Sequence, residues 1–236
     1  MSTDRTAPVD TRMMGIVHDA LRRDLDRTRT ALTASIPPAN SQRVALADHL
    51  MWMMEFLRLH HRTEDDTLWP LIRRLKPDAA PLLDRMDADH ASISPGIDRL
   101  RAAAEAYRTD GSAHTRDAVI TALDGLEAPL LPHLRREEDE MMPVVARTIT
   151  IGQWDDWGHD IMKDRPKLEL AREVPWILDG LDDDRYREVT GALPAVPRFL
   201  LLHALAGRYR RASATRWGGK VEVTPRRSRR HERRPA

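Results

Sequence analysis

The chain has 236 residues, of which 32% are charged and 5% aromatic, and its formal net charge is +1. It contains no cysteine, which excludes disulfides, iron–sulfur clusters and thiolate zinc sites and favours a reducing, cytoplasmic location. No apolar run approaches the roughly 18 residues of a membrane span, and residues 1–10 contain no apolar stretch typical of a signal peptide. Residues 208–236 hold 11 of the 38 Lys and Arg but only 2 of the 37 acidic residues, so an acidic body precedes a basic tail.

The first 150 residues contain four amphipathic segments, in which apolar side chains recur every three or four positions. The expected inward faces are Met14, His18, Leu21, Leu25, Thr28 and Leu32; Leu46, Leu50, Met53, Leu57, His60, Glu64, then Thr67 or Leu68, and Leu71; Leu83, Met86, His90, Ile93, Ile97, Leu100 and Ala104; and Val119, Leu123, Leu126, Leu130, His133, Glu137, Met141 and Val144. Turn or capping residues lie at 37–41, 76–78 and 109–112. The sequence therefore predicts an all-α fold, an up-down-up-down four-helix bundle over residues 11–149.

The C-terminal third has a different character. It holds four of the six tryptophans, and prolines at 166, 175, 194 and 197 divide it into short segments, with a helix expected over 197–211. We interpret residues 150–215 as a helical extension that packs on the bundle or forms a partner or dimer surface. Residues 216–236 are predicted to be a disordered basic tail, which could bind nucleic acid or anionic lipid and is more simply a solvated tail.

A short pattern within the bundle occurs twice. Residues 60–70 and 133–143 each begin with a histidine, continue with a glutamate four positions later and end with a proline ten positions later. Another histidine precedes each copy at nearly the same spacing, His18 before the first and His90 before the second. Two copies of one half-site are therefore indicated.

The four histidines and two glutamates of this repeat take inward positions that Leu or Met would otherwise occupy. Burying two carboxylates without partners is strongly destabilising, so bound cations are the expected compensation. A histidine and a glutamate four residues apart share one face of a helix and can reach the same metal pair. Imidazole and carboxylate donors suit non-haem iron and, less selectively, manganese or zinc. A metal-free bundle with hydrogen-bonded core histidines is the alternative.

The six donors, in this order along the chain, resemble those of hemerythrin-like proteins with an HHE cation-binding domain, over residues 11–149. The residues that carry the resemblance are His18, His60, Glu64, His90, His133 and Glu137. The resemblance implies a non-haem di-iron centre, bridged by the two glutamates and by an oxo or hydroxo group. It also implies O₂, peroxide or nitric oxide as the small ligand.

The resemblance assigns His18 and His60 to one iron and the other two histidines to the second iron. Invertebrate oxygen carriers have a further histidine four positions after the third-helix histidine, where this chain has Ser94. His61 is the candidate replacement, and an exposed or merely neighbouring imidazole is the alternative. Without His61, the second iron would have an extra open position, which favours reaction over reversible storage.

Several polar residues lie near these donors in the sequence. Asp87 could accept a hydrogen bond from the second ring nitrogen of a ligand histidine, or it could be a helix N-terminal charge. His49 lies about 16 Å from His60 along the same helix, too far to share the metals. The acids that follow the inward glutamates lie off the inward face and are predicted to be solvated. They are Asp65, Asp66, Glu138 and Asp139.

Two classes of function follow for a di-iron site. The first is an oxidoreductase of small oxygen species, catalase-like or peroxidase-like, with a role in oxidative stress and an unidentified electron donor. The second is a non-enzymatic protein that binds or senses O₂, nitric oxide or iron. A ferritin-like di-iron oxygenase is disfavoured because the chain has no Glu-x-x-His pair, and zinc hydrolysis is disfavoured because it has no His-Glu-x-x-His.

Overall fold

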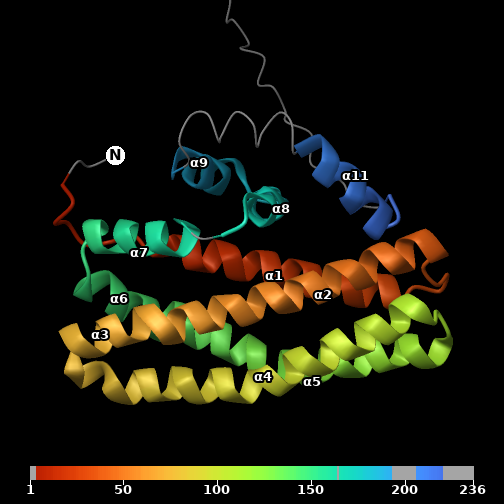
Figure 1. Cartoon of the computed structure of the whole chain (residues 1–236), viewed down its shortest axis with the longest axis horizontal. Coiled ribbons are helices and arrows are strands. Elements are labelled where there is room, and N and C mark those ends of the chain that lie inside the picture. The colour runs from red at the N-terminus through yellow and green to blue at the C-terminus, as the bar shows by residue number, and fades with distance from the viewer. Residues whose placement is uncertain (1–3, 164, 193–205, 220–236) are drawn as a thin grey trace, which may run out of the picture.

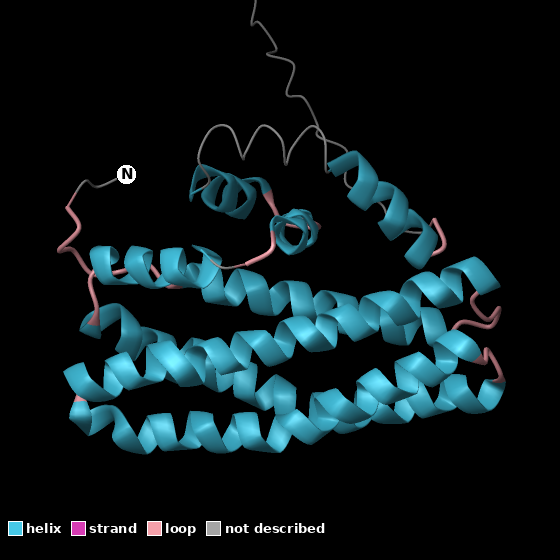
Figure 2. Cartoon of the chain, viewed as in Figure 1, coloured by secondary structure: helices cyan, strands magenta, loops and turns pink. Residues whose placement is uncertain are grey.

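The computed structural model describes residues 4–163, 165–192 and 206–219. Within these ranges the regular structure is helical, apart from an isolated β-bridge between Pro8 and Thr150, so the predicted all-α class is confirmed (Figure 2). Among the described helices, none is both long enough and apolar enough to span a membrane. The predicted tail beyond residue 219, and residues 197–205 of the helix expected over 197–211, lie outside the described residues.

Four long helical segments lie side by side, and Figure 1 shows turns joining them at alternate ends. Two of these segments are interrupted by a π-helical turn and continue as a short α-helix. The elements are α1 (Arg12–Leu32); α2 (Asn40–Thr63), the π-turn η1 (Glu64–Leu68) and α3 (Trp69–Leu75); the 3₁₀ turn η2 (Pro77–Ala79) and α4 (Ala80–Thr109); and α5 (Ala113–Arg136), the π-turn η3 (Glu137–Met141) and α6 (Met142–Thr148).

The predicted inward faces of α1 and α4 are confirmed, since each of their expected positions is buried. The predictions for the other two segments fail after the π-turns. Of the two alternatives Thr67 and Leu68, Leu68 is the buried one, but the next expected position, Leu71, is only partly buried and Ile72 is fully buried instead. In the last segment Val145, rather than the expected Val144, is fully buried. The inward face is therefore shifted by one residue beyond each π-turn.

A proline, the last residue of each copy of the repeat, follows each π-turn by two residues. The Trp69 N–H bonds to the carbonyl of Glu64, five residues earlier, and Pro70 follows directly. A proline ring has no N–H and crowds the carbonyl four residues before it, which a wider π-turn relieves. The second copy, which ends with Pro143, has the same arrangement. Each proline of the repeat therefore marks a π-turn.

The apolar core has two parts, and the donor residues lie between them. Met14 belongs to one buried cluster and Leu21 to the other, with the fully buried His18 between them on α1. The same order holds on α4, where His90 separates Met86 from Ile93. The sequence thus positions a polar layer across the bundle with apolar packing on both sides.

The described part of the C-terminal extension lies on one side of the bundle, over α1 and α2 (Figure 1). Its helices are α7 (Ile151–Lys163), α8 (Lys167–Leu178), α9 (Asp183–Ala192) and α11 (Ala206–Arg216). Trp176 and Trp217 are buried in the same apolar cluster as the core of the bundle. The extension therefore shares the core of the bundle through these two indoles.

A buried polar group links α8 to the bundle. The carboxylate of Asp24 accepts hydrogen bonds from His49 Nε2 at 2.7 Å, from Trp176 Nε1 at 2.9 Å and from Arg23 Nε at 2.9 Å. Burial, together with the charge of Arg216, lowers the pKa of His49 to about 4, although Asp24 opposes the shift. His49 is therefore a neutral donor to Asp24 at pH 7.

This group should make the fold sensitive to acid. The unfolded chain takes up a proton on His49 near pH 6.5, whereas the folded chain does so only near pH 4. Stability should therefore fall as the pH drops from 6.5 to 4, by about 3 kcal/mol from this residue. Urea unfolding of the wild type and His49→Gln at pH 7 and pH 4 measures the effect. If His49→Gln lost as much stability as the wild type between pH 7 and pH 4, the prediction would be contradicted. His114→Gln, at an exposed position, is the control.

Candidate metal centre

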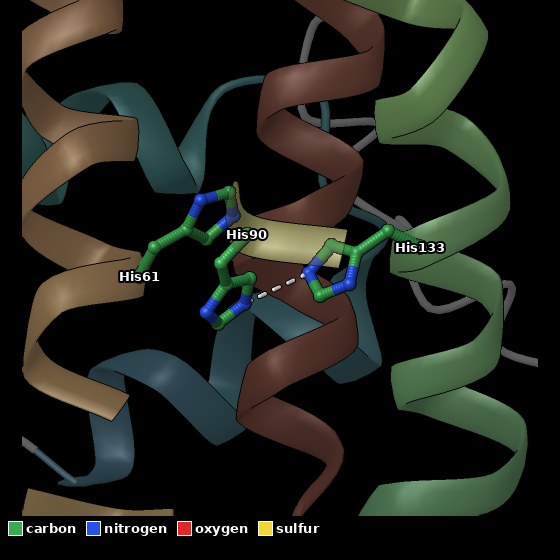
Figure 3. A group of neighbouring side chains, drawn as sticks. All are labelled: His61, His90 and His133. Carbon is green, nitrogen blue, oxygen red and sulfur yellow. Dashed lines mark hydrogen bonds between the residues drawn. The ribbon is translucent and has the colours of Figure 1, made fainter. Parts of the chain in front are cut away.

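Three histidines converge from three helices. Figure 3 shows His61 of α2, His90 of α4 and His133 of α5 pointing toward one another. The Nε2 atoms of His90 and His133 are 3.2 Å apart, and the ring of His61 stacks on that of His90 with centroids 4.1 Å apart. One nitrogen from each residue lies within 4.8 Å of the other two, and all three side chains are buried. This spacing allows one metal ion to bind all three imidazoles.

A second group of donors faces the first across the same layer. His18 of α1 and His60 of α2 have their Nε2 atoms 3.3 Å apart. The Oε2 atom of Glu137, the first residue of η3, is 3.3 Å from His18 Nε2. These three residues also bring one donor atom each within 4.8 Å of one another. The layer thus contains two adjacent sets of metal donors.

The two glutamates connect the groups. Glu64 places Oε1 3.2 Å from His60 Nε2 and Oε2 3.6 Å from His90 Nε2. Glu137 also contacts both groups, through one oxygen: its Oε2 lies 3.3 Å from His18 Nε2 and 3.7 Å from His133 Nε2. Each carboxylate therefore faces both donor sets, as a bridging ligand would.

The two glutamates of this layer have no hydrogen-bond donor among the described residues. Glu64 and Glu137 are 1% and 0% exposed, and among the described residues none hydrogen-bonds to their four carboxylate oxygens or to His61 Nε2. Burial, with Glu137 beside it, raises the pKa of Glu64 well above its ordinary value. Two adjacent buried carboxylates without donors need positive charge, and their neighbours are imidazole nitrogens. The residues present therefore fit a pair of metal cations.

The protonation of the histidines is compatible with this fit. Burial lowers the pKa of His60 to about 3 and that of His133 to about 4, so both imidazoles are neutral at pH 7 and can donate to a metal. Burial also acts on His18, but Glu137 and Glu138 raise the pKa of that imidazole to about 9. A cation bound between His18 and Glu137 would reverse this effect because it would replace the proton.

Comparison with known families agrees with this geometry. The family model for the hemerythrin HHE cation binding domain matches residues 10–145, more than half of the chain. The chain belongs to this family. No curated protein and no solved structure gives a significant match. Membership of the hemerythrin HHE family indicates that the domain binds a metal cation, and the two donor groups fit that role.

The structure of this hemerythrin domain brings together every residue that the sequence predicted as a donor. They are His18, His60, His61, Glu64, His90, His133 and Glu137. The sequence left open whether His61 is a donor or a neighbouring imidazole, and the structure groups it with His90 of α4 and His133 of α5. The predicted division of the other four histidines into two pairs matches the two groups.

Two of the acids that were predicted to lie on solvated flanks are at least partly exposed, but they also contact donor histidines, which the sequence did not predict. Asp65 Oδ1 accepts a hydrogen bond from His90 Nδ1 at 2.7 Å, and Glu138 Oε1 accepts one from His18 Nδ1 at 2.7 Å. The residue after an inward glutamate is rotated by about 100°, which places its side chain at the edge of the helix, within reach of a histidine on a neighbouring helix. The repeated acid after each inward glutamate was the available signal in the sequence.

Asp87 does not orient a donor histidine, contrary to one of its two predicted roles. Its carboxylate pairs with Arg73, 2.5 Å away, on the surface of the bundle. Asp89 lies nearer to the site, with Oδ2 3.4 Å from His133 Nδ1, and it also pairs with Arg136. Since Asp89 is one residue before His90, its side chain faces the next helix, which the α4 pattern alone did not reveal.

Removing either supporting acid should weaken metal binding without removing a donor. We expect Asp65→Ala and Glu138→Ala each to lower metal affinity about 10–100-fold, because the paired histidine loses the partner that fixes its ring and tautomer. Competition with a chelator of known affinity measures this. Asp139→Ala is the matched control, since Asp139 is an exposed acid on the same turn. Equal affinities in all three variants would contradict the assigned role.

Proposed function

We propose that this hemerythrin-family protein is a non-haem di-iron protein that reacts with small oxygen species, on an up-down-up-down four-helix bundle. An oxo or hydroxo group would complete the bridge between the irons. The proposed ligands are His18 and His60 for one iron, His61, His90 and His133 for the other, and Glu64 and Glu137 for both. Iron supplies Lewis acidity and exchangeable electrons at such a site.

The observation that carries this proposal is the unequal number of imidazoles in the two groups. One group contains two histidines and the other three, while each glutamate lies near a histidine of both groups. The ion held by His18 and His60 has fewer protein donors and therefore more room for O₂, hydrogen peroxide or nitric oxide. Open coordination positions favour reaction of such ligands at the metal. In this assignment the extra open position belongs to the His18 side, because His61 completes the other group.

A surface pocket near His18 offers a route by which a small ligand could enter the site from the side of the His18 and His60 group. The pocket has a volume of about 350 Å³, and Gly15, Ile16, Asp19, Glu138 and Met142 contribute to its wall. Glu138 also accepts the hydrogen bond from His18, so the pocket ends one residue away from a donor. A diatomic gas or hydrogen peroxide is small enough to enter such a space. The apolar clusters on both sides of the layer shield the donors from bulk water.

Peroxide turnover tests the proposal. Iron-loaded protein should first show two irons per chain and an optical spectrum with oxo-to-iron bands, which would also distinguish iron from manganese or zinc. Addition of hydrogen peroxide should then release O₂ or consume peroxide with an added reductant. His60→Ala and Glu137→Ala should abolish this turnover, whereas His114→Ala, at an exposed position, should retain it. Stable, reversible O₂ binding without turnover would instead favour a binding or sensing role.

A further inference from the structure

A short series of aromatic side chains leads from the metal centre to the C-terminal extension. The ring of His60 stacks on that of Phe56, with centroids 6.2 Å apart and planes at 8°. Phe56 in turn meets the indole of Trp176 edge-on, with centroids 4.9 Å apart. One phenyl ring therefore separates a proposed iron ligand from a tryptophan of α8.

One contact of Trp176, its hydrogen bond to a carboxylate, favours loss of an electron from the indole. The side chain is fully buried, and Nε1 donates to Asp24 Oδ2 at 2.9 Å. Burial alone would raise the pKa of Asp24, but His49 and Arg23 hold it well below its ordinary value. Asp24 is therefore a carboxylate at pH 7. A negative charge hydrogen-bonded to the indole stabilises positive charge on that ring.

Trp52 is the next aromatic neighbour, and its surroundings differ. Its ring lies 5.1 Å from that of Trp176 and 5.9 Å from that of Phe56. Its Nε1 donates to Glu169 at 3.1 Å, but the guanidinium of Arg172 sits 4.3 Å from the ring centroid. A cation over the face of an indole opposes positive charge on that ring. Trp52 is 9% exposed, compared with 0% for Trp176, so it is the nearer of the two to solvent.

From these contacts we propose that Trp176 is an electron relay for the metal centre, which it reaches through Phe56 and His60. The relay rests on the proposed function. Reduction of one hydrogen peroxide to two water molecules breaks the O–O bond and takes two protons from solvent and two electrons, which the metal pair would supply. The indole of Trp176 would then return these electrons to the oxidised pair one at a time, in two successive steps. No bond breaks in Trp176, which becomes a radical cation held beside the Asp24 carboxylate. An external one-electron reductant then restores Trp176 by way of Trp52.

This relay gives the C-terminal extension a role in the chemistry of the bundle. Trp176 lies outside residues 10–145, to which the family model applies, whereas Phe56 and His60 lie within them. A purely structural role for Trp176, as an anchor for α8, makes a different prediction. An anchor would change stability when replaced, but it would not carry an unpaired electron.

The experiment compares iron-loaded wild type with three variants after rapid mixing with hydrogen peroxide and freezing. Trp176→Phe removes the relay indole, and Phe56→Leu breaks the series while leaving the indole in place. Trp154→Phe is the matched control, since it removes a partly buried indole of the same extension whose ring contacts Trp157. Electron paramagnetic resonance detects a tryptophan radical, and peptide mass spectrometry locates oxidised tryptophan. Iron content and thermal melting establish that each variant is folded and loaded.

The expected result is a tryptophan radical in the wild type and in Trp154→Phe, with loss of this signal in Trp176→Phe and in Phe56→Leu. Oxidation products should map to Trp176 in the wild type. An undiminished radical in Trp176→Phe would overturn the relay, as would an iron spectrum that changes with peroxide while no radical forms in the wild type. An iron spectrum that does not respond to peroxide in the wild type would overturn the proposed function, and the relay with it.

Discussion

Replacing Glu64 by glutamine is expected to abolish binding of the metal pair and to make the metal-free protein more stable. The carboxylate faces both groups of histidines, so its loss removes a donor from each proposed ion. Without cations, the same carboxylate is buried beside Glu137, and its pKa is raised by burial and by that neighbour. A neutral amide of similar shape avoids the cost of keeping this buried carboxyl group protonated above its ordinary pKa, with an expected gain of about 1–4 kcal/mol.

The gain in stability should depend on pH. Above pH 4.5 the unfolded chain releases the Glu64 proton while the folded chain retains it, so wild-type stability falls as the pH rises. The advantage of Glu64→Gln should therefore be largest near pH 7 and should shrink toward pH 4.5. Metal per chain and urea unfolding in the presence of a chelator measure the two effects. Asp66→Asn, an exposed acid two residues later, should change neither. A variant that keeps its metals, or a less stable metal-free variant, would contradict the bridging assignment.

Replacing His61 by leucine is expected to remove one metal ion of the pair and retain the other. His61 completes the group with His90 and His133, and its Nε2 has no hydrogen-bond partner among the described residues. Loss of a hydrogen-bond partner of a metal ligand typically lowers metal affinity by about 10–100-fold. Loss of a direct donor should therefore lower the affinity for that ion by more than about 100-fold. The other group, which contains His18, keeps its own imidazoles.

Metal analysis after dialysis against a weak chelator should give about half the wild-type content in His61→Leu, because one of the proposed two ions is lost. His114→Leu replaces an exposed histidine and should keep the full content. Leucine suits a buried position between apolar clusters, so melting of the metal-free variant should change little. Full metal content with an unchanged optical spectrum in His61→Leu would show that the imidazole is only a neighbour of the site.

Six of the seven candidate donors could be predicted from the sequence because they occupy regular inward positions, whereas His61, which follows an inward histidine, could not be settled in this way. On α1 and α4 the spacing of three and four residues continues from end to end, so each expected position is buried. The same reasoning failed beyond η1 and η3, where a π-turn shifts the inward face from Leu71 to Ile72 and from Val144 to Val145. A pattern with a fixed period of 3.6 residues cannot predict the extra residue that a π-turn adds to a helical turn. The repeated proline was the local sign of it.

Contacts between helices were harder to predict than positions along one helix. Asp65 and Glu138 support histidines 25 and 120 positions away in the chain, and each lies on a flank that appears solvated when its own helix is considered alone. Trp176 was recognised as part of an extension, but its contacts with Asp24 and Phe56 join segments more than 100 positions apart. Such pairs depend on how the helices pack, which periodicity does not specify.

The supporting acids connect the two halves of the bundle in a reciprocal way. Asp65, from the half that contains α1 and α2, holds His90 of the other half, while Glu138, from the half with α4 and α5, holds His18 of the first. Neither helical hairpin can therefore complete its own cluster in isolation. The domain is organised like an intramolecular dimer with exchanged arms, in which closure of the tertiary structure must come before a fully oriented site exists.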